Sequence, residues 1–125
     1  MAKFTIGGEA IEVGPANFDA LEICLTDWIE AQQRVAEATN PADQMRAMFA
    51  GSLTILRALA VQTLPQDASS SDVAAQVGVW KGKIVGIAEI RSLAEGMGDW
   101  LRESGVVEAG EPKPGAKGQR RPAKS

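Results

Sequence analysis

The stretch N-P-A-D-Q-M-R-A-M-F-A-G-S-L-T-I-L-R-A-L-A-V-Q-T-L-P, residues 40–65, decides the fold that we predict for this chain. It opens with Asn40, a capping residue, followed by Pro41 at the first helical position and Asp43 in the positively polarised first turn. The Leu-Pro pair at its end stops the helix near residue 63. Apolar residues cover a wide arc between these ends, so we expect this helix to be the most buried one.

Two methionines, Met45 and Met48, lie in the first half of this helix. Methionine fills irregular gaps in cores and is also common on adaptable binding surfaces. We interpret the pair as core, with a binding surface as the alternative.

A second amphipathic helix is predicted before this stretch, from a cap at Asn17 to beyond residue 35. The opposite face is acidic, and a plain solvated face is the simplest interpretation of it. Ile23 projects on that polar side and is therefore a candidate partner-binding residue. The side chains expected to face the core recur at spacings of three and four: Phe18, Leu21, Cys24, Leu25, Trp28, Ile29 and Val35.

The N-terminal segment, residues 3–13, alternates apolar and polar residues around Gly7 and Gly8. A Gly-Gly pair between alternating runs predicts a two-residue hairpin turn. Pairing Ile6 with Glu9 places Phe4 opposite Ile11 and Ala2 opposite Val13. An isolated hairpin is only marginally stable, so its apolar face must rest on another element.

The segment after the central helix is interrupted by glycines. A short helix starting at Ser69 or Ser71 and ending near residue 77 is expected first. Glycines 78, 82 and 86 follow, and we expect a chain break at 78–82 and a helix from about residue 83 to a C-cap at Gly105. A small hairpin turning at Lys81-Gly82 is the alternative.

Trp80 and Trp100 lie in this last third of the chain. Tryptophan is favoured where interfaces form, so both are candidate partner-binding residues. Packing in the core is the alternative for both.

The predicted fold is mainly α with a small N-terminal β-hairpin (α+β), with three to four helices packed as a small bundle. Residues 1–107 form one helical domain that includes the hairpin 3–13. Residues 108–125 have no apolar residue larger than alanine or proline, and are expected to form a disordered basic tail.

The tail carries five lysine and arginine side chains against two glutamates, whereas the rest of the chain is acidic. A solvated terminus, a protein-binding segment and a nucleic-acid contact are the possible interpretations. Nucleic acid is the least favoured, because a few dispersed cations without an aromatic residue make a weak phosphate-binding surface. The candidate contacts in the tail are Lys113, Lys117, Arg120 and Arg121.

The composition argues against catalysis. The chain has no histidine, which removes the commonest general base and a common metal ligand, and Cys24 is its only cysteine. Gly7-Gly8 lacks the residues of a phosphate-binding loop, and no calcium-type spacing of carboxylates appears. We therefore expect no enzyme activity, no cofactor and no metal. No apolar run is long enough to cross a bilayer and no secretory signal is evident, so a soluble cytoplasmic protein is expected.

The order of these parts resembles the tail assembly chaperones of long-tailed bacteriophages and related prophages. The resemblance covers about residues 3–111, and its separate motifs are common ones whose succession carries the likeness. They are the Phe4-x-Ile6-Gly7-Gly8 hairpin closing on Ile11-x-Val13, the two helices divided at Asn40-Pro41, the stop at Leu64-Pro65, the helix ending Trp100-Leu101-Arg102-Glu103-Ser104-Gly105-Val106-Val107, and the Gly/Pro/Lys/Ala tail from Gly110-Glu111.

The resemblance implies a non-catalytic protein that binds the hydrophobic tape measure protein before tube assembly. It also implies self-association, a location in the host cytoplasm, and absence from the mature virion. Many family members have a longer, frameshifted form whose extension is thought to recruit tail-tube subunits, and the tail would then be a flexible joint. A nucleic-acid-binding accessory protein and a minor structural tail or connector protein are the alternatives.

Overall fold

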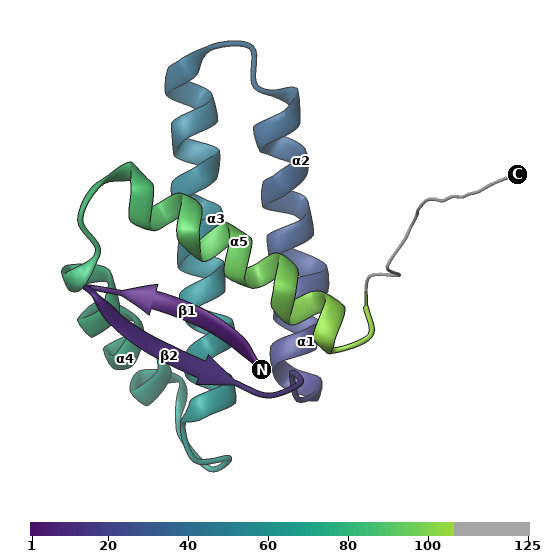
Figure 1. Ribbon diagram of the computed structural model, residues 1–125, viewed down its shortest axis with the longest axis vertical. Helices are drawn as coiled ribbons and strands as arrows, with labels where there is room; N and C mark the ends of the chain where they lie inside the picture. Colours follow the sequence, from purple (N-terminus) through teal and green to yellow (C-terminus); the bar gives the residue numbers. More distant parts are fainter. Residues whose placement is uncertain (107–125) are drawn as a thin grey trace, which may run out of the picture.

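The computed structural model of the chain describes residues 1–106 (Figure 1). The described chain has four continuous helical stretches, the first of which spans residues 18–37. The fold class predicted from the sequence, mainly helical with an N-terminal hairpin, is confirmed. The elements are β1 (Ala2–Ile6), β2 (Glu9–Val13), α1 (Phe18–Ile23), η1 (Cys24–Trp28), α2 (Ile29–Glu37), α3 (Pro41–Thr63), α4 (Ser70–Lys83) and α5 (Gly86–Glu103).

Helix α3 lies at the centre and packs against α1, α2, α4 and α5. It begins where the sequence predicts, because the Asn40 side chain accepts a hydrogen bond from the Asp43 amide at 2.9 Å. It ends at Thr63 before the Leu-Pro pair. Nine of its residues are buried, more than in any other element of the described chain, so the expectation of a most-buried helix is confirmed. Met45 and Met48 are half-buried at its margin.

The hairpin has the predicted register, with Ile6 opposite Glu9 and Phe4 opposite Ile11. Gly7 and Gly8 have φ angles of 60° and 82°, the left-handed values that a two-residue turn of this twist requires. The apolar face of β1 packs on α5 (Figure 1). This contact supplies the support that an isolated hairpin lacks.

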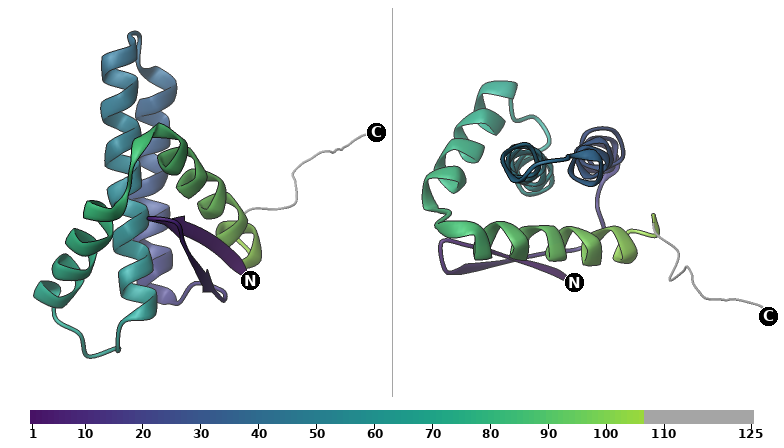
Figure 2. Two further views of the ribbon diagram at one scale, coloured as in Figure 1. Left: turned by 60° about the vertical axis from the view of Figure 1, so that its left-hand side comes forward. Right: turned by 90° about the horizontal axis from the view of Figure 1, so that it is seen from above.

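The hairpin and α5 are joined by a buried aromatic pair. The rings of Phe4 and Trp100 meet edge to face, with centroids 5.6 Å apart. The Trp100 indole Nε1–H donates to the Gly14 carbonyl oxygen at 2.8 Å and so fixes the chain where it leaves β2. Figure 2 shows the hairpin and α5 together along one side of the α2–α3 pair.

The helix boundary predicted after residue 77 is wrong. Helix α4 begins after a capping box between Ser69 and Asp72, as one of the predicted starts requires, but it continues through Gly78 and Gly82 to Lys83. The chain turns at Ile84 and Val85, and Gly86, at a φ of 82°, opens α5. Buried packing of Trp80 compensates for the low helix propensity of the glycines around it.

Helix α5 ends as predicted at Gly105. Its φ is 81°, its amide donates to the Arg102 carbonyl, and the Val106 amide donates to the Leu101 carbonyl at 3.0 Å. These two bonds form a Schellman motif, which satisfies carbonyl groups that the helix end leaves free.

The apolar face predicted for residues 18–35 is only partly covered. Cys24 is fully buried and Trp28 half-buried, but Phe18 is 79% exposed and Leu25 49% exposed. Leu25 and Ile29 each follow a covered residue, Cys24 and Trp28, and both are exposed. The helix is therefore apolar over a wider arc than its neighbours cover.

Candidate partner-binding groove

A groove runs between α1, α3 and α4 on the surface of the described fold. It consists of three adjoining hollows with volumes of about 590, 580 and 180 Å³. The first two share Ile23, Val61 and Val73, and the last two share Leu53 and Lys81. We refer to these three hollows together as the α3–α4 groove.

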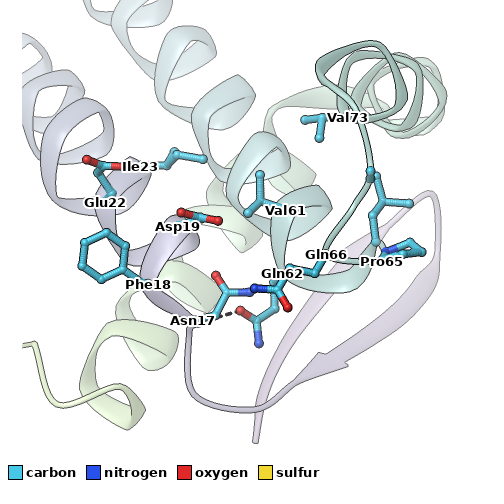
Figure 3. Close-up of a pocket in the computed structure, with 12 residues that line it drawn as sticks. Asn17, Phe18, Asp19, Glu22, Ile23, Val61, Gln62, Pro65, Gln66 and Val73 are labelled. Carbon is cyan, nitrogen blue, oxygen red and sulfur yellow. Dashed lines mark hydrogen bonds between the residues drawn. The ribbon is translucent and has the colours of Figure 1, made fainter.

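The first hollow lies at the end of α3 and is shown in Figure 3. Ile23 from α1, Val61 from α3 and Val73 from α4 all line it. The start of α1 is held against the end of α3, because the Asn17 amide donates to Gln62 Oε1 at 2.8 Å. Three helices thus present branched aliphatic side chains to one space.

The other two hollows follow α3 toward its N-terminal half. Leu53, Arg57 and Val61 form one row on α3, while Val73, Val77 and Lys81 form a row on α4. The two helices are inclined to each other (Figure 2), so these rows do not close on one another. Leu53 remains 41% exposed as a result.

Charged side chains of opposite sign stand toward opposite ends of the groove. Asp19 and Glu22 line the hollow at the Val61 end, whereas Lys81 lines both hollows at the Leu53 end. None of these three side chains forms an ion pair with another residue in 1–106. Arg57, between them, pairs with Asp27 of η1.

The predicted partner-binding residues are placed differently by the structure. Ile23 does not project into solvent; it is half-buried, packs against the core and lines the groove. Trp80 is 9% exposed and Trp100 is 1% exposed, so both side chains belong to the core. Neither indole is therefore exposed enough to anchor a partner on this surface.

The tail residues proposed as contacts lie outside the described part of the chain. They are Lys113, Lys117, Arg120 and Arg121.

Sequence reasoning missed most of the groove. Phe49 and Leu53 belong to the wide apolar arc for which the sequence predicts burial, yet they are 44% and 41% exposed and line the groove. The glycine pattern predicts a helix end near Val77 and a chain break from Gly78. Both residues instead lie within α4 and line the groove. The available signal was the width of the apolar arc on α3, which exceeds what one neighbouring helix covers.

The only cysteine in the chain sits in the core. Cys24 is 0% exposed, with its Sγ 3.6 Å from the Met97 sulfur, and burial raises the pKa of the thiol from 9.0 to about 11. A thiol that stays protonated at neutral pH is a poor nucleophile. Its contribution here is to packing.

The groove combines exposed apolar side chains with charged side chains near its ends, and these are features of a surface that binds another polypeptide. In residues 1–106 no group of three or more cysteine and carboxylate side chains is placed to hold a metal ion. Among the described helices, none combines the length and the apolar character needed to span a bilayer. Comparisons of the chain with protein-family models, with curated proteins and with solved structures found no match.

Proposed function

We propose that this protein is a non-catalytic tail assembly chaperone that binds apolar helical segments of a tape measure protein and keeps them soluble until the tail tube assembles. The single observation that carries the proposal is the α3–α4 groove. Partner helices dock in grooves of this kind through side chains at helical spacing. The resemblance of the order of elements to phage tail assembly chaperones supplies the identity of the partner.

The groove suits a chaperone because its middle and Phe49 hollows are lined mainly by apolar side chains, while the helices that carry them are held by the core. Leu53 and Phe49 belong to α3, whose other face carries the centre of the core. Val77 belongs to α4, which is anchored by Trp80. The exposed apolar side chains can therefore be covered by a partner without any part of the described fold having to unfold.

The experiment is co-expression of the full chain with a tape-measure-like protein. Leu53→Glu places a carboxylate on the groove floor, and we expect it to lower the soluble fraction of the tape measure protein severalfold, because a buried unpaired charge opposes docking. Val85→Glu is the matched control. It replaces another exposed aliphatic residue, 78% exposed and outside the groove, and should leave solubility unchanged.

A second pair of variants tests the groove by volume alone. A Cβ added at Gly78 or at Gly82 would meet nothing within 4 Å, but only Gly78 lines the groove. Gly78→Gln should reduce the soluble fraction of the co-expressed tape measure protein, and Gly82→Gln should not. Circular dichroism should show that both variants are folded. If the wild-type chain leaves the tape measure protein as insoluble as an empty vector does, the proposed function is wrong.

The recruitment of tail-tube subunits, self-association and location in the host cytoplasm belong to the same proposal. The nucleic-acid alternative depends on the tail, and the structural-protein alternative predicts the chain in purified virions at a fixed stoichiometry. Absence of this chain from purified virions would favour the chaperone function.

A further inference from the structure

We infer that the α3–α4 groove binds an amphipathic helix of about three turns with acidic residues at one end and basic residues at the other, seated with its acidic end at Lys81 and its basic end at Asp19 and Glu22. The inference rests on the proposed function and specifies the partner segment that the same groove accepts. Three observations carry it: the length of the groove, the spacing of its apolar side chains, and the order of its charges.

The length follows from the α3 residues that line it. Phe49 stands in the hollow at one end and Val61 in the hollow at the other. At a rise of 1.5 Å per residue, the helix between them spans about 18 Å. An occupant of about twelve helical residues covers this distance.

The apolar rows point to a helix as the occupant. Leu53 and Val61 stand two helical repeats apart on α3, and Val73 and Val77 stand one repeat apart on α4. Rows at this spacing form ridges and grooves into which the ridges of another helix pack. The Cβ-free surface of Gly78 adds depth beside them, because nothing lies within 4 Å of the space where a side chain would stand.

The charges give the occupant its polarity. Lys81 at one end and the carboxylates of Asp19 and Glu22 at the other have no ion-pair partner within the described chain. Opposite charges on a docked helix would pair with them, whereas like charges oppose docking. Arg57 is already neutralised by Asp27, so the middle of the groove does not select for charge.

The polarity also sets the direction. A helix is itself stabilised by acidic residues in its first turn and basic residues in its last. A helix of that kind, seated with its acidic end at Lys81, begins beside Phe49 and ends beside Val61. It therefore runs parallel to α3 and antiparallel to α4.

The test uses blocked synthetic peptides of fourteen residues and the full chain. The matched peptide carries glutamates in its first turn, leucines at spacings of three and four, and lysines in its last turn. The control peptide has the same composition with its charges alternating along the polar face. We expect the matched peptide to bind about three- to tenfold more tightly at low salt, and this preference to shrink in high salt. Equal affinities at low salt, or no binding of either peptide, would overturn the inference.

Variants of the chain assign the effect to the groove. Lys81→Glu should weaken binding of the matched peptide severalfold. Arg91→Glu is the control, because Arg91 is an exposed cation outside the groove that also forms no ion pair in residues 1–106. Equal losses from the two variants would show that net charge, and not position, governs affinity.

Direction is read by a spin label on the peptide. A nitroxide at the C-terminal end should broaden the amide signals of Asp19 and Glu22, and one at the N-terminal end that of Lys81. The reverse pattern overturns the assigned direction. If the tape measure protein is kept soluble but the peptides show no charge preference, this inference fails and the proposed function stands. If the peptides bind as described but solubility is not maintained, the proposed function fails.

Discussion

Gly96 is the residue that allows the hairpin to lie directly on α5. A Cβ at this position would stand 2.8 Å from Phe4 Cδ1 and 2.9 Å from the Lys3 carbonyl oxygen. The second contact is with backbone, which cannot rotate away. The missing side chain at this position lets the backbone of β1 approach α5 closely.

We therefore expect Gly96→Ala to lower the free energy of unfolding by about 2 kcal/mol, as overpacking of a tight contact does. Gly82→Ala is the control with the opposite sign. Its Cβ would meet nothing within 4 Å and its residue is helical, so it should raise stability by up to about 1 kcal/mol. Urea denaturation of both variants measures the two effects. A Gly96→Ala protein as stable as the wild type would show that β1 is not seated as described.

Cys24 gives stability a dependence on alkaline pH. Burial raises the pKa of its thiol from 9.0 to about 11, so the unfolded chain loses the thiol proton at a pH where the native chain keeps it. The free energy of unfolding should therefore fall as the pH rises through this range, by about 2 to 3 kcal/mol at pH 11. Well below pH 9 this contribution is constant.

The measurement is urea denaturation at pH 8 and pH 10.5 for the wild type and Cys24→Ala. The variant is less stable at both values because of the cavity it leaves. Its loss of stability between the two pH values should be smaller than that of the wild type, since it lacks the titrating thiol. Identical pH dependence in the two proteins would contradict the assigned pKa.

At the scale of elements, the hairpin and α5 form one unit held by Trp100. Its Nε1–H bonds the Gly14 carbonyl, and its ring meets Phe4. We expect Trp100→Phe to lower the free energy of unfolding by about 2 to 3 kcal/mol, because it removes that hydrogen bond and leaves space in the core. Thermal melts followed by circular dichroism measure the loss.

Trp28→Phe is the matched control for that variant. The Trp28 Nε1 is buried and has no hydrogen-bond partner in residues 1–106. Removing an unsatisfied N–H offsets part of the lost packing, so this change should cost clearly less than Trp100→Phe. A larger cost at Trp28 would contradict the hydrogen bonding described here.

Local signals in the sequence predict most element boundaries. Asn17, Asn40 and Ser69 cap helices, and Gly105 ends one, because each effect depends on a few neighbouring backbone groups. The α4–α5 boundary could not be predicted in this way. Three glycines are spaced through this region, and only Gly86 takes a positive φ, so the spacing of the glycines alone does not identify the one that ends α4.

At the scale of the molecule, the groove depends on how α4 is inclined to α3. Sequence periodicity identified Leu53 as apolar and helical but not which part of the α3 arc stays uncovered. That outcome is set by contacts between elements distant in sequence. The predicted burial of the apolar face of residues 18–35 is partly wrong for the same reason. Phe18 and Leu25 belong to that face but are exposed, because no neighbouring element covers them.

The core of the described chain lies between Ala2 and Leu101. We therefore expect deletion of residues 110–125 to leave the melting temperature and helix content unchanged. The same deletion tests the nucleic-acid alternative, because any binding to a duplex or single strand that falls steeply with salt should disappear with the five cations. Salt-sensitive binding that survives the deletion would place the contact on the folded body.

The first and last parts of the described fold meet at Glu103. One carboxylate oxygen lies 3.0 Å from the Met1 amino group, and the other accepts a hydrogen bond from the Ala2 amide at 2.8 Å. A short glycine linker from residue 106 back to residue 1 would span this junction, and the chain could be reopened in the loop at residues 38–40. Such a circular permutant would begin with α3 and end with α2, and we expect it to fold, because the contacts at Glu103 already bring its new junction together.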